Sequence, residues 1–232
     1  AVILSGGTGS RMGPGTPKQY QTVAGKPVLV HTMEQFQRCE DIGCVAVAAA
    51  GEWQEQILQW KAEHRLSKLR VLAPAGEDRQ GSILSGLRAL KPFLSGPEDG
   101  VVIQDAVRPL TSTALIRRLL KGLEEAPCVL PVLPVTDTTY TSRDGQWVDG
   151  LLERSALYAG QAPEAFRYLD YLQLYEETAP ELLSSMSGSC QLPYSRGWKV
   201  KMIPGELENM KVTYPKDLER CEKLLRERET LT

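Results

Sequence analysis

Hydrophobic residues along the chain gather in short runs that alternate with longer segments of helical spacing. The short runs suit buried parallel strands and lie at residues 1–4, 44–50, 69–73, 100–105, 128–134 and 199–203. The helical segments lie at residues 27–36, 52–66, 80–90, 112–125 and 167–178, and a charged amphipathic helix begins at Pro215. This alternation predicts an α/β fold, a Rossmann-like, doubly wound and mainly parallel sheet with right-handed crossovers. Ligands of such sheets bind beyond the carboxyl ends of the strands.

Two stretches interrupt the alternation. Residues 137–160 contain strand-like segments at 137–142 and 146–148 on either side of Asp144-Gly145, a dipeptide typical of hairpin turns, and they predict a projecting β-hairpin. Such a hairpin suits a dimerisation arm, although a local edge hairpin accounts for the pattern equally well. Residues 184–197 are expected to be mobile. Because no repeat or linker divides the chain, we expect residues 1–232 to form a single domain with residues 137–160 as its arm.

Composition and charge narrow the class of protein. The chain has 232 residues, 42% of them hydrophobic, and a net charge of −2, so no global basic field favours nucleic acid. No apolar run reaches the roughly 18 residues of a transmembrane helix, and we expect no signal peptide. The five cysteines include no Cys-x-x-Cys pair, which favours free thiols over a zinc site. We therefore expect a cytoplasmic protein that binds neither nucleic acid nor membrane.

A glycine-rich loop follows the first strand. Gly6, Gly7 and Gly9 precede Arg11, and Lys18 comes seven residues after that arginine. Glycine lets the backbone approach a ligand closely, and exposed N–H groups in such a loop form an anion-binding concavity. With two cations beside it, the loop predicts a cradle for a diphosphate or triphosphate. A glycine-rich surface loop with two solvated cations is the alternative interpretation.

Known phosphate-binding patterns do not fit this loop. The dinucleotide fingerprint fails because Met12 stands where its third glycine is needed. The P-loop pattern fails because Pro27 follows Gly25-Lys26. The two histidines, His31 and His64, stand among helical or charged residues, so a Ser-His-Asp hydrolase is poorly supported.

Two further loops follow predicted strands. Gly76 and Ser82 stand at the start of a predicted helix, where they suit a phosphate or a base edge, although Ser82 could serve only as a helix cap. Asp105 ends the strand at 100–105, where a carboxylate can bind Mg²⁺ or a ribose hydroxyl. Arg108 could pair with a phosphate, or it could form a purely structural pair with Asp105.

The glycine-rich loop also carries a family resemblance. Ser-Gly-Gly-Thr-Gly-Ser-Arg-Met-Gly at residues 5–13 and Pro-Lys-Gln-Tyr at 17–20 resemble the signature of CTP-dependent cytidylyltransferases that act on sugar-alcohol phosphates. Best known among these are the enzymes for 2-C-methyl-D-erythritol 4-phosphate and for ribitol 5-phosphate. Similar motifs follow in the same order at residues 75–82, 104–109, 134–138, 152–166 and 208–213. The resemblance therefore covers nearly the whole chain.

The resemblance implies a role for each motif. It makes Arg11, Lys18 and Lys211 the catalytic cations. It assigns the binding of CTP to Ser5, Gly6, Gly7, Gly9, Gly76, Ser82 and Asp105. It assigns the acceptor to Arg108, Thr138, Arg154 and Thr213, with Thr138 and Arg154 supplied by the arm of a partner subunit. It further implies a Mg²⁺ cofactor, with Asp105 as its candidate ligand, and a homodimer with shared active sites.

The function implied is transfer of CMP from CTP to a polyol phosphate with release of pyrophosphate. 2-C-methyl-D-erythritol 4-phosphate, an isoprenoid precursor, is the favoured acceptor. D-ribitol 5-phosphate, used for wall or capsule polymers, comes second. Because the acceptor phosphate is already ionised, no general base is required. Two alternatives are a nicotinamide-dependent oxidoreductase, which the failed fingerprint disfavours, and a non-catalytic nucleotide-binding protein, which the retained cations disfavour.

The chain departs from the family pattern on the acceptor side. Residues 161–164 read Gln-Ala-Pro-Glu where Gln-Thr-Pro-Gln is usual, so Ala162 lacks a hydroxyl that the erythritol-phosphate enzymes use. Residues 187–190 read Ser-Gly-Ser-Cys where Thr-Asp-Asp or Thr-Asp-Ala is usual, and Gln104 replaces a histidine. The resemblance therefore gives its weakest support to the identity of the acceptor.

Overall fold

The computed structural model describes residues 1–7, 15–94 and 96–230. Its centre is one sheet in the order β10-β7-β11-β6-β1-β4-β5, with β12 on the other edge of β7. These strands are β1 (Val2–Leu4), β4 (Val45–Ala49), β5 (Leu69–Pro74), β6 (Gly100–Asp105), β7 (Cys128–Pro134), β10 (Tyr158–Gly160), β11 (Glu164–Arg167) and β12 (Val200–Pro204). The pairings β1–β4, β4–β5, β1–β6 and β7–β12 are parallel, whereas β10 and β11 run antiparallel to their neighbours. The predicted mainly parallel α/β sheet is confirmed.

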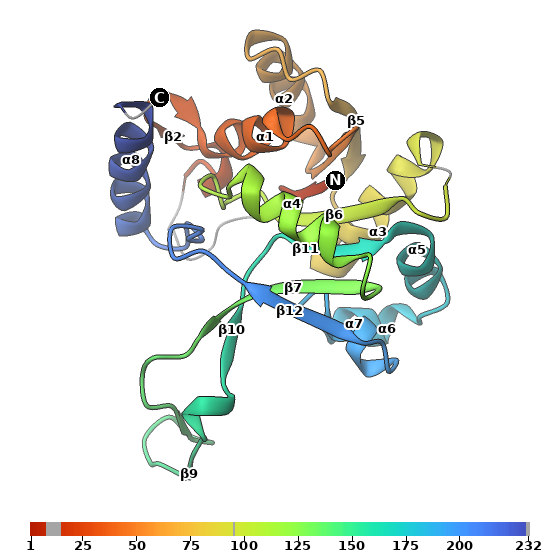
Figure 1. The fold of residues 1–232 in the computed structure, drawn as a ribbon. Helices are drawn as coiled ribbons and strands as arrows, with labels where there is room; N and C mark the ends of the chain where they lie inside the picture. Colours follow the sequence, from red (N-terminus) through yellow and green to blue (C-terminus); the bar gives the residue numbers. More distant parts are fainter. Residues whose placement is uncertain (8–14, 95, 231–232) are drawn as a thin grey trace.

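Helices cover both faces of this sheet (Figure 1). They are α1 (Val28–Arg38), α2 (Gly51–Glu63), α3 (Arg79–Leu90), α4 (Thr113–Gly122), α5 (Tyr168–Glu176), α6 (Pro180–Ser184), α7 (Gln191–Ser195) and α8 (Pro215–Thr230). Successive strand residues point to opposite faces. Accordingly, Ile3 packs in the core with Leu29 of α1, while Val2 packs in the other core with Ile83 of α3. The central strands are apolar on both faces, so each face of the sheet forms a core with the helices that cover it.

The stretch 184–197, which we expected to be mobile, is partly helical and partly buried. It contains α7, and Ser189 and Leu192 are fully buried. Gln80 reaches this segment from α3 and donates a hydrogen bond to the carbonyl of Met186 at 2.9 Å. The segment therefore lies against α3.

Strand β11 lies between β6 and β7 and was not predicted. Its residues Glu164 and Phe166 pair with Ile103 and Val101 of β6. The peptide bond between Ala162 and Pro163, just before the strand, is cis. With only four residues, beginning with a glutamate, β11 shows no strand pattern of its own, and its place follows from tertiary packing.

Residues 137–160 project from the body as an arm (Figure 1). The arm contains one short ladder, β8 (Tyr140–Thr141) against β9 (Gly150–Leu151). The predicted strand at residues 146–148 is wrong, because the Asp144 carboxylate accepts hydrogen bonds from the backbone of Gln146 and Trp147 and folds them into a turn. Trp147 is 76% exposed, so the arm carries apolar surface that its own chain leaves uncovered.

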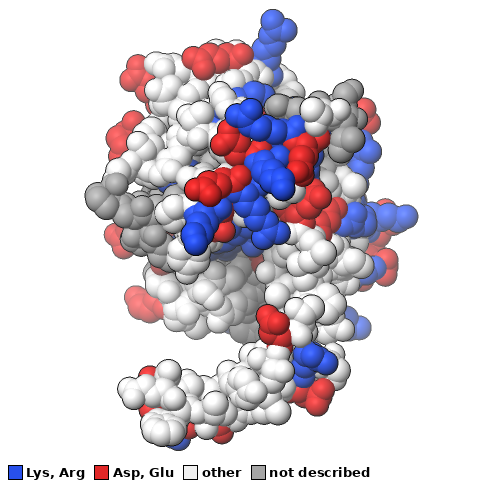
Figure 2. Space-filling view, turned by 90° about the vertical axis from the view of Figure 1, so that its left-hand side faces the viewer, with Lys and Arg blue, Asp and Glu red and all other residues white. Residues whose placement is uncertain are grey.

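Helix α8 closes the chain against a third apolar cluster that includes Val28, Val212 and Leu225. The small ladder of β2 (Thr22–Val23) and β3 (Lys26–Pro27) lies beside it. Figure 2 shows this side of the molecule, where side chains of both signs are interspersed. The pair of Arg226 with Glu222, at 2.7 Å, is one example. Within the described part of the chain, no helix combines the length and apolar character that a membrane span requires.

Candidate active site

Three cations converge on one carboxylate where β6 ends. Lys211 Nζ lies 3.0 Å from Asp105 Oδ2, Arg79 Nη2 lies 3.3 Å from Oδ1, and Arg108 Nε lies 3.6 Å from Oδ2. Burial raises the pKa of Asp105, but the charges of Lys211, Arg79 and Arg108 outweigh burial and hold that pKa well below its ordinary value. The carboxylate is therefore ionised and surrounded by excess positive charge, which suits an anionic ligand.

Lys211 is held in place by the loop that precedes α8. Asn209 is fully buried, and its side chain donates to the Ala162 carbonyl at 2.7 Å and accepts from the Thr111 hydroxyl at 2.8 Å. Arg108 donates to the Asn209 carbonyl at 2.7 Å. These bonds fix the backbone two residues before Lys211, so its ammonium group is positioned before any ligand arrives.

A cavity of about 410 Å³ opens beside this cluster. It is lined by glycine backbone from two loops, by Lys18 and by the charged cluster, and its wall includes Gly6, Gly7, Gly76, Ser82, Asp105 and Lys211. Lys18 is only 8% exposed and begins the short helix Lys18–Tyr20. Exposed glycine backbone forms anion-binding concavities, and cations beside it suit a phosphate.

The two glycine loops need glycine for close packing. A Cβ on Gly6 would lie 2.6 Å from Ala75 Cβ, and a Cβ on Gly76 would lie 2.4 Å from the backbone of Gly81. Gln19 ties the first loop down by donating to the carbonyl of Gly7 at 2.7 Å. Ser5 supports the loop from beneath, where its hydroxyl donates to Tyr20.

The second loop leads into α3. Asp78 caps this helix by accepting from the Gly81 N–H at 2.7 Å, so Ser82 is not the cap. Ser82 instead accepts from the Gly76 N–H at 3.0 Å and donates to the Asp78 carbonyl. The loop is thereby closed on itself at the edge of the cavity.

A second cavity, of about 330 Å³, meets the first at the charged cluster. Both are lined by Arg79, Asp105 and Lys211, and the second adds Arg108 and Glu164. Two adjoining cavities that share their cations can hold two anionic ligands with their charged groups in contact.

The comparison with known proteins decides the family. Residues 1–227 match the model of IspD, 2-C-methyl-D-erythritol 4-phosphate cytidylyltransferase. This chain belongs to the IspD family. It is 37% identical over 232 residues to the 2-C-methyl-D-erythritol 4-phosphate cytidylyltransferase of Rubrobacter xylanophilus, across 99% of this chain and 95% of that protein. The resemblance that the glycine-rich loop suggested is confirmed.

Solved structures agree with this membership of the IspD family. The 2-C-methyl-D-erythritol 4-phosphate cytidylyltransferase of Thermus thermophilus is similar with a TM-score of 0.76 and 25% identity, over 97% of this chain and 98% of that one. The 4-diphosphocytidyl-2C-methyl-D-erythritol synthase of Anaerococcus prevotii shares the fold, with a TM-score of 0.78 over 97% of this chain and 96% of that one, at 24% identity.

Among the predicted site residues, the two cavities bring together Gly6, Gly7, Lys18, Gly76, Ser82, Asp105, Arg108 and Lys211. Gly9 and Arg11 lie outside the described residues. Thr213 follows the cluster without lining either cavity, and its hydroxyl bonds to the Lys211 carbonyl. Thr138 and Arg154 stay on the exposed arm, where Arg154 donates to the Thr136 carbonyl at 3.3 Å. In this chain Thr138 and Arg154 therefore lie outside both cavities.

Two members of the site, Arg79 and Glu164, were not predicted. Arg79 donates to Ser189 at 2.7 Å as well as pairing with Asp105, and Glu164 is buried beside them. Arg79 lies inside the motif at residues 75–82, so the motif itself contained the signal. Glu164 reaches the cavity only because β11 enters the sheet, and the pattern of the chain did not indicate that strand.

Nucleotidyltransferases generally depend on a divalent metal ion. Among the described residues, no group of three or more histidine, cysteine, aspartate or glutamate side chains could hold a metal ion by itself. Mg²⁺ in nucleotide sites is typically held by one or two carboxylates together with substrate phosphates. Asp105 offers one such carboxylate on the wall of the glycine-lined cavity. The donor set therefore fits an ion that arrives with the nucleotide.

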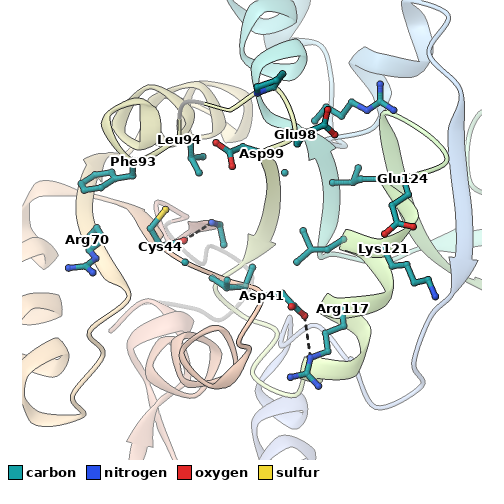
Figure 3. Close-up of a pocket in the computed structure, with 18 residues that line it drawn as sticks. Asp41, Cys44, Arg70, Phe93, Leu94, Glu98, Asp99, Arg117, Lys121 and Glu124 are labelled. Carbon is teal, nitrogen blue, oxygen red and sulfur yellow. Dashed lines mark hydrogen bonds and ion pairs between the residues drawn. The ribbon is translucent and has the colours of Figure 1, made fainter.

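A larger cavity, of about 1010 Å³, lies at the opposite ends of the parallel strands. Figure 3 shows that both acidic and basic side chains line it, and Arg117 pairs with Asp41 at 3.3 Å. Its wall includes Ala1 and Gly100, at the amino ends of β1 and β6. Because it lies away from the carboxyl ends of the strands and from the charged cluster, we do not place the chemistry there.

Proposed function

We propose that this chain transfers CMP from CTP to 2-C-methyl-D-erythritol 4-phosphate and releases pyrophosphate. The observation that carries this proposal is the junction of two cavities at Asp105, Arg79 and Lys211. CTP would occupy the glycine-lined cavity and the acceptor its neighbour. Membership of the IspD family supports both substrates.

The transfer forms one P–O bond and breaks another. An oxygen of the acceptor phosphate attacks the α-phosphorus of CTP, and the bond to the β-phosphate breaks, so that pyrophosphate carries away the electron pair. A phosphate monoester is already mostly doubly ionised near pH 7, with a second pKa of about 6. The chain therefore needs to supply position and positive charge rather than a base.

Lys18 and Lys211 supply that charge in this proposal. Lys18 lies deep in the glycine-lined cavity and would neutralise the triphosphate. Lys211 lies at the junction, within reach of both the α-phosphate and the attacking phosphate, and Arg108 would hold the latter. By the resemblance, Arg11 adds a third catalytic cation. Fixed charges that meet developing charge in the transition state are among the largest contributions to catalysis.

We further propose Mg²⁺ as the divalent ion, held by Asp105 and the triphosphate oxygens. Once bound, it would neutralise charge on the leaving pyrophosphate.

We propose that the enzyme works as a homodimer in which each arm completes the other subunit's site. Thr138 and Arg154 would bind the acceptor phosphate across the two-fold axis. Exposed apolar side chains along the arm, such as Tyr140, Trp147 and Leu151, support an interface there.

We also propose a cytoplasmic location. The five cysteines of the chain are all buried and form no disulfide, which supports this location.

The test is pyrophosphate release by the purified protein. It is assayed with CTP and, in turn, 2-C-methyl-D-erythritol 4-phosphate, D-ribitol 5-phosphate or no acceptor. We expect the highest kcat/KM with the erythritol derivative and no release without an acceptor. Faster turnover of D-ribitol 5-phosphate would show that this compound is the acceptor instead. No pyrophosphate release with any polyol phosphate would contradict the proposed function. Assays with ATP or GTP in place of CTP test the selectivity for the nucleotide. Turnover equal to that with CTP would contradict the assignment of the pocket beside Gly76 to CTP.

A further inference from the structure

A buried carboxyl group, that of Glu164, is among the groups that line the second cavity. The side chain is 8% exposed, and its Oε2 atom has no hydrogen-bond partner. It borders the same cavity as Arg108 and Lys211. A buried carboxylate oxygen without a partner is unfavourable, and in folded proteins most such atoms are satisfied by a neighbour, water or a ligand.

The rest of this carboxyl group is held firmly. Glu164 opens strand β11, where it pairs with Ile103 between two neighbouring strands. Ser189 and Cys190 hydrogen-bond to its side chain. Burial raises the pKa of Glu164, more than the charge of Arg79 lowers it. A donor from a ligand would stabilise the charged form that burial disfavours.

We propose that Glu164 determines acceptor specificity by accepting, through Oε2, a hydrogen bond from a hydroxyl group of the polyol. This inference rests on the proposed function. A polyol phosphate carries two kinds of group. Its phosphate is drawn to the cations and repelled by a carboxylate, whereas its hydroxyls can donate to one.

The arrangement of the cavity then orients the acceptor. Arg108 and Lys211 hold the phosphate end at the junction with the nucleotide, and Glu164 holds the polyol chain. Three cations engage the carboxylate of Asp105, so in this proposal Glu164 and not Asp105 accepts from the polyol. Ala162 lines the same cavity with an apolar side chain that cannot hydrogen-bond to the polyol. We therefore assign recognition of the polyol hydroxyls to Glu164.

The experiment combines changes in the protein with changes in the substrate. Wild type and Glu164→Gln are assayed with 2-C-methyl-D-erythritol 4-phosphate and with analogues in which one hydroxyl at a time is replaced by hydrogen. Glutamine preserves the shape, and its amide oxygen can keep the Ser189 bond while its NH₂ group replaces the accepting Oε2.

For wild type we expect one analogue to lose about 10- to 100-fold in kcat/KM, the scale of a hydrogen bond to a charged group. For Glu164→Gln the intact acceptor should already show that loss, and removing the same hydroxyl should add little. The KM for CTP should stay unchanged. Glu176→Gln makes the same chemical change in an exposed ion pair with Arg88 and should leave every ratio as in wild type.

Equal losses for every acceptor, or a raised KM for CTP, would show that Glu164 only positions Arg79 and Arg108, and would overturn the proposal. So would a Glu164→Gln enzyme that behaves like wild type. If that variant does not fold, the wild-type series alone decides. Removing a hydroxyl that donates to Glu164 must lower the kcat/KM of wild type about tenfold or more. The same acceptors titrated calorimetrically onto wild type need no turnover. This separates a failure of the inference from a failure of the proposed function.

Discussion

Lys211 Nζ lies 3.0 Å from Asp105 Oδ2, and this ion pair joins the end of β6 to the loop that precedes α8. Both cavities of the site meet at the pair. The lysine is fixed through Asn209, whose side chain bridges Thr111 and the carbonyl of Ala162. A ligand that binds Lys211 therefore meets a charge whose position is set by the fold.

Lys211→Ala should lower kcat by about 10²- to 10³-fold, which corresponds to about 3–4 kcal/mol of lost transition-state stabilisation. The reason is that Lys211 lies at the junction of the two cavities, where its charge would meet both reacting phosphates. Steady-state kinetics with both substrates measures the effect, and Lys216→Ala, an exposed lysine of α8, serves as the control. An unchanged kcat with a raised KM would assign Lys211 to ground-state binding alone.

Asp105→Asn should destabilise the protein in a pH-dependent way. The folded-state pKa of Asp105 lies below its ordinary value of 3.8, so its charge contributes full stability above pH ~4 and progressively less as the pH falls below it. Near neutral pH we expect a loss of about 3 kcal/mol, the scale of removing one partner of a buried pair. Urea unfolding at pH 7, 5 and 3 measures the difference from wild type. A difference that grows on acidification would contradict this account, and Asp137→Asn in the exposed arm should show no such trend.

Gly76→Ala should impair CTP binding, because its Cβ would lie 2.4 Å from the backbone of Gly81 and push the loop away from α3. We expect a KM for CTP raised about tenfold or more, since phosphate-binding backbone must hold its geometry. Gly51→Ala is the matched control. Its Cβ meets nothing within 4 Å, and at the start of α2 it should be neutral or stabilise by up to about 1 kcal/mol. Equal effects of the two changes would refute the packing argument.

The shared-site dimer predicts complementation between two inactive variants. If each arm completes the partner's site, Lys18→Ala and Arg154→Ala should each be nearly inactive alone. Co-refolding them should place both defects in one site of each hybrid dimer and leave the other site intact. With about half of the dimers hybrid, about a quarter of all sites are intact, and activity should return to roughly that fraction of wild type. A mixture that stays inactive while hybrids are shown to form would assign Arg154 to its own chain or to no role.

The strands and helices that were predicted correctly are those whose own residues specify them. Strand β4 reads Val-Ala-Val-Ala-Ala and is buried throughout, so its pattern is unambiguous. Strand β11 could not be predicted, because a four-residue segment that begins with Glu164 becomes a strand only between two others. The turn at Asp144 was located, but the bonds its carboxylate makes to the following backbone excluded the predicted strand.

The same distinction holds for the site. Gly6, Lys18, Asp105 and Lys211 were predicted from motifs that stand in loops after strands, and the fold gathers the ends of those strands. Glu164 lies inside a motif that was recognised only for its departure from the family. Its importance comes from burial beside Arg79, which depends on how β11 and residues 187–191 pack together.

In the proposed reaction, the acceptor phosphate itself attacks the α-phosphorus of CTP at the junction of the two cavities. The most direct measurement follows oxygen-18 from the phosphate of 2-C-methyl-D-erythritol 4-phosphate into the products by mass spectrometry. We expect the joined product, the diphosphocytidyl derivative of the polyol, to retain every labelled oxygen, one of them bridging the two phosphorus atoms, and the pyrophosphate to carry none. Label in the pyrophosphate, or release of CMP without a joined product, would contradict it.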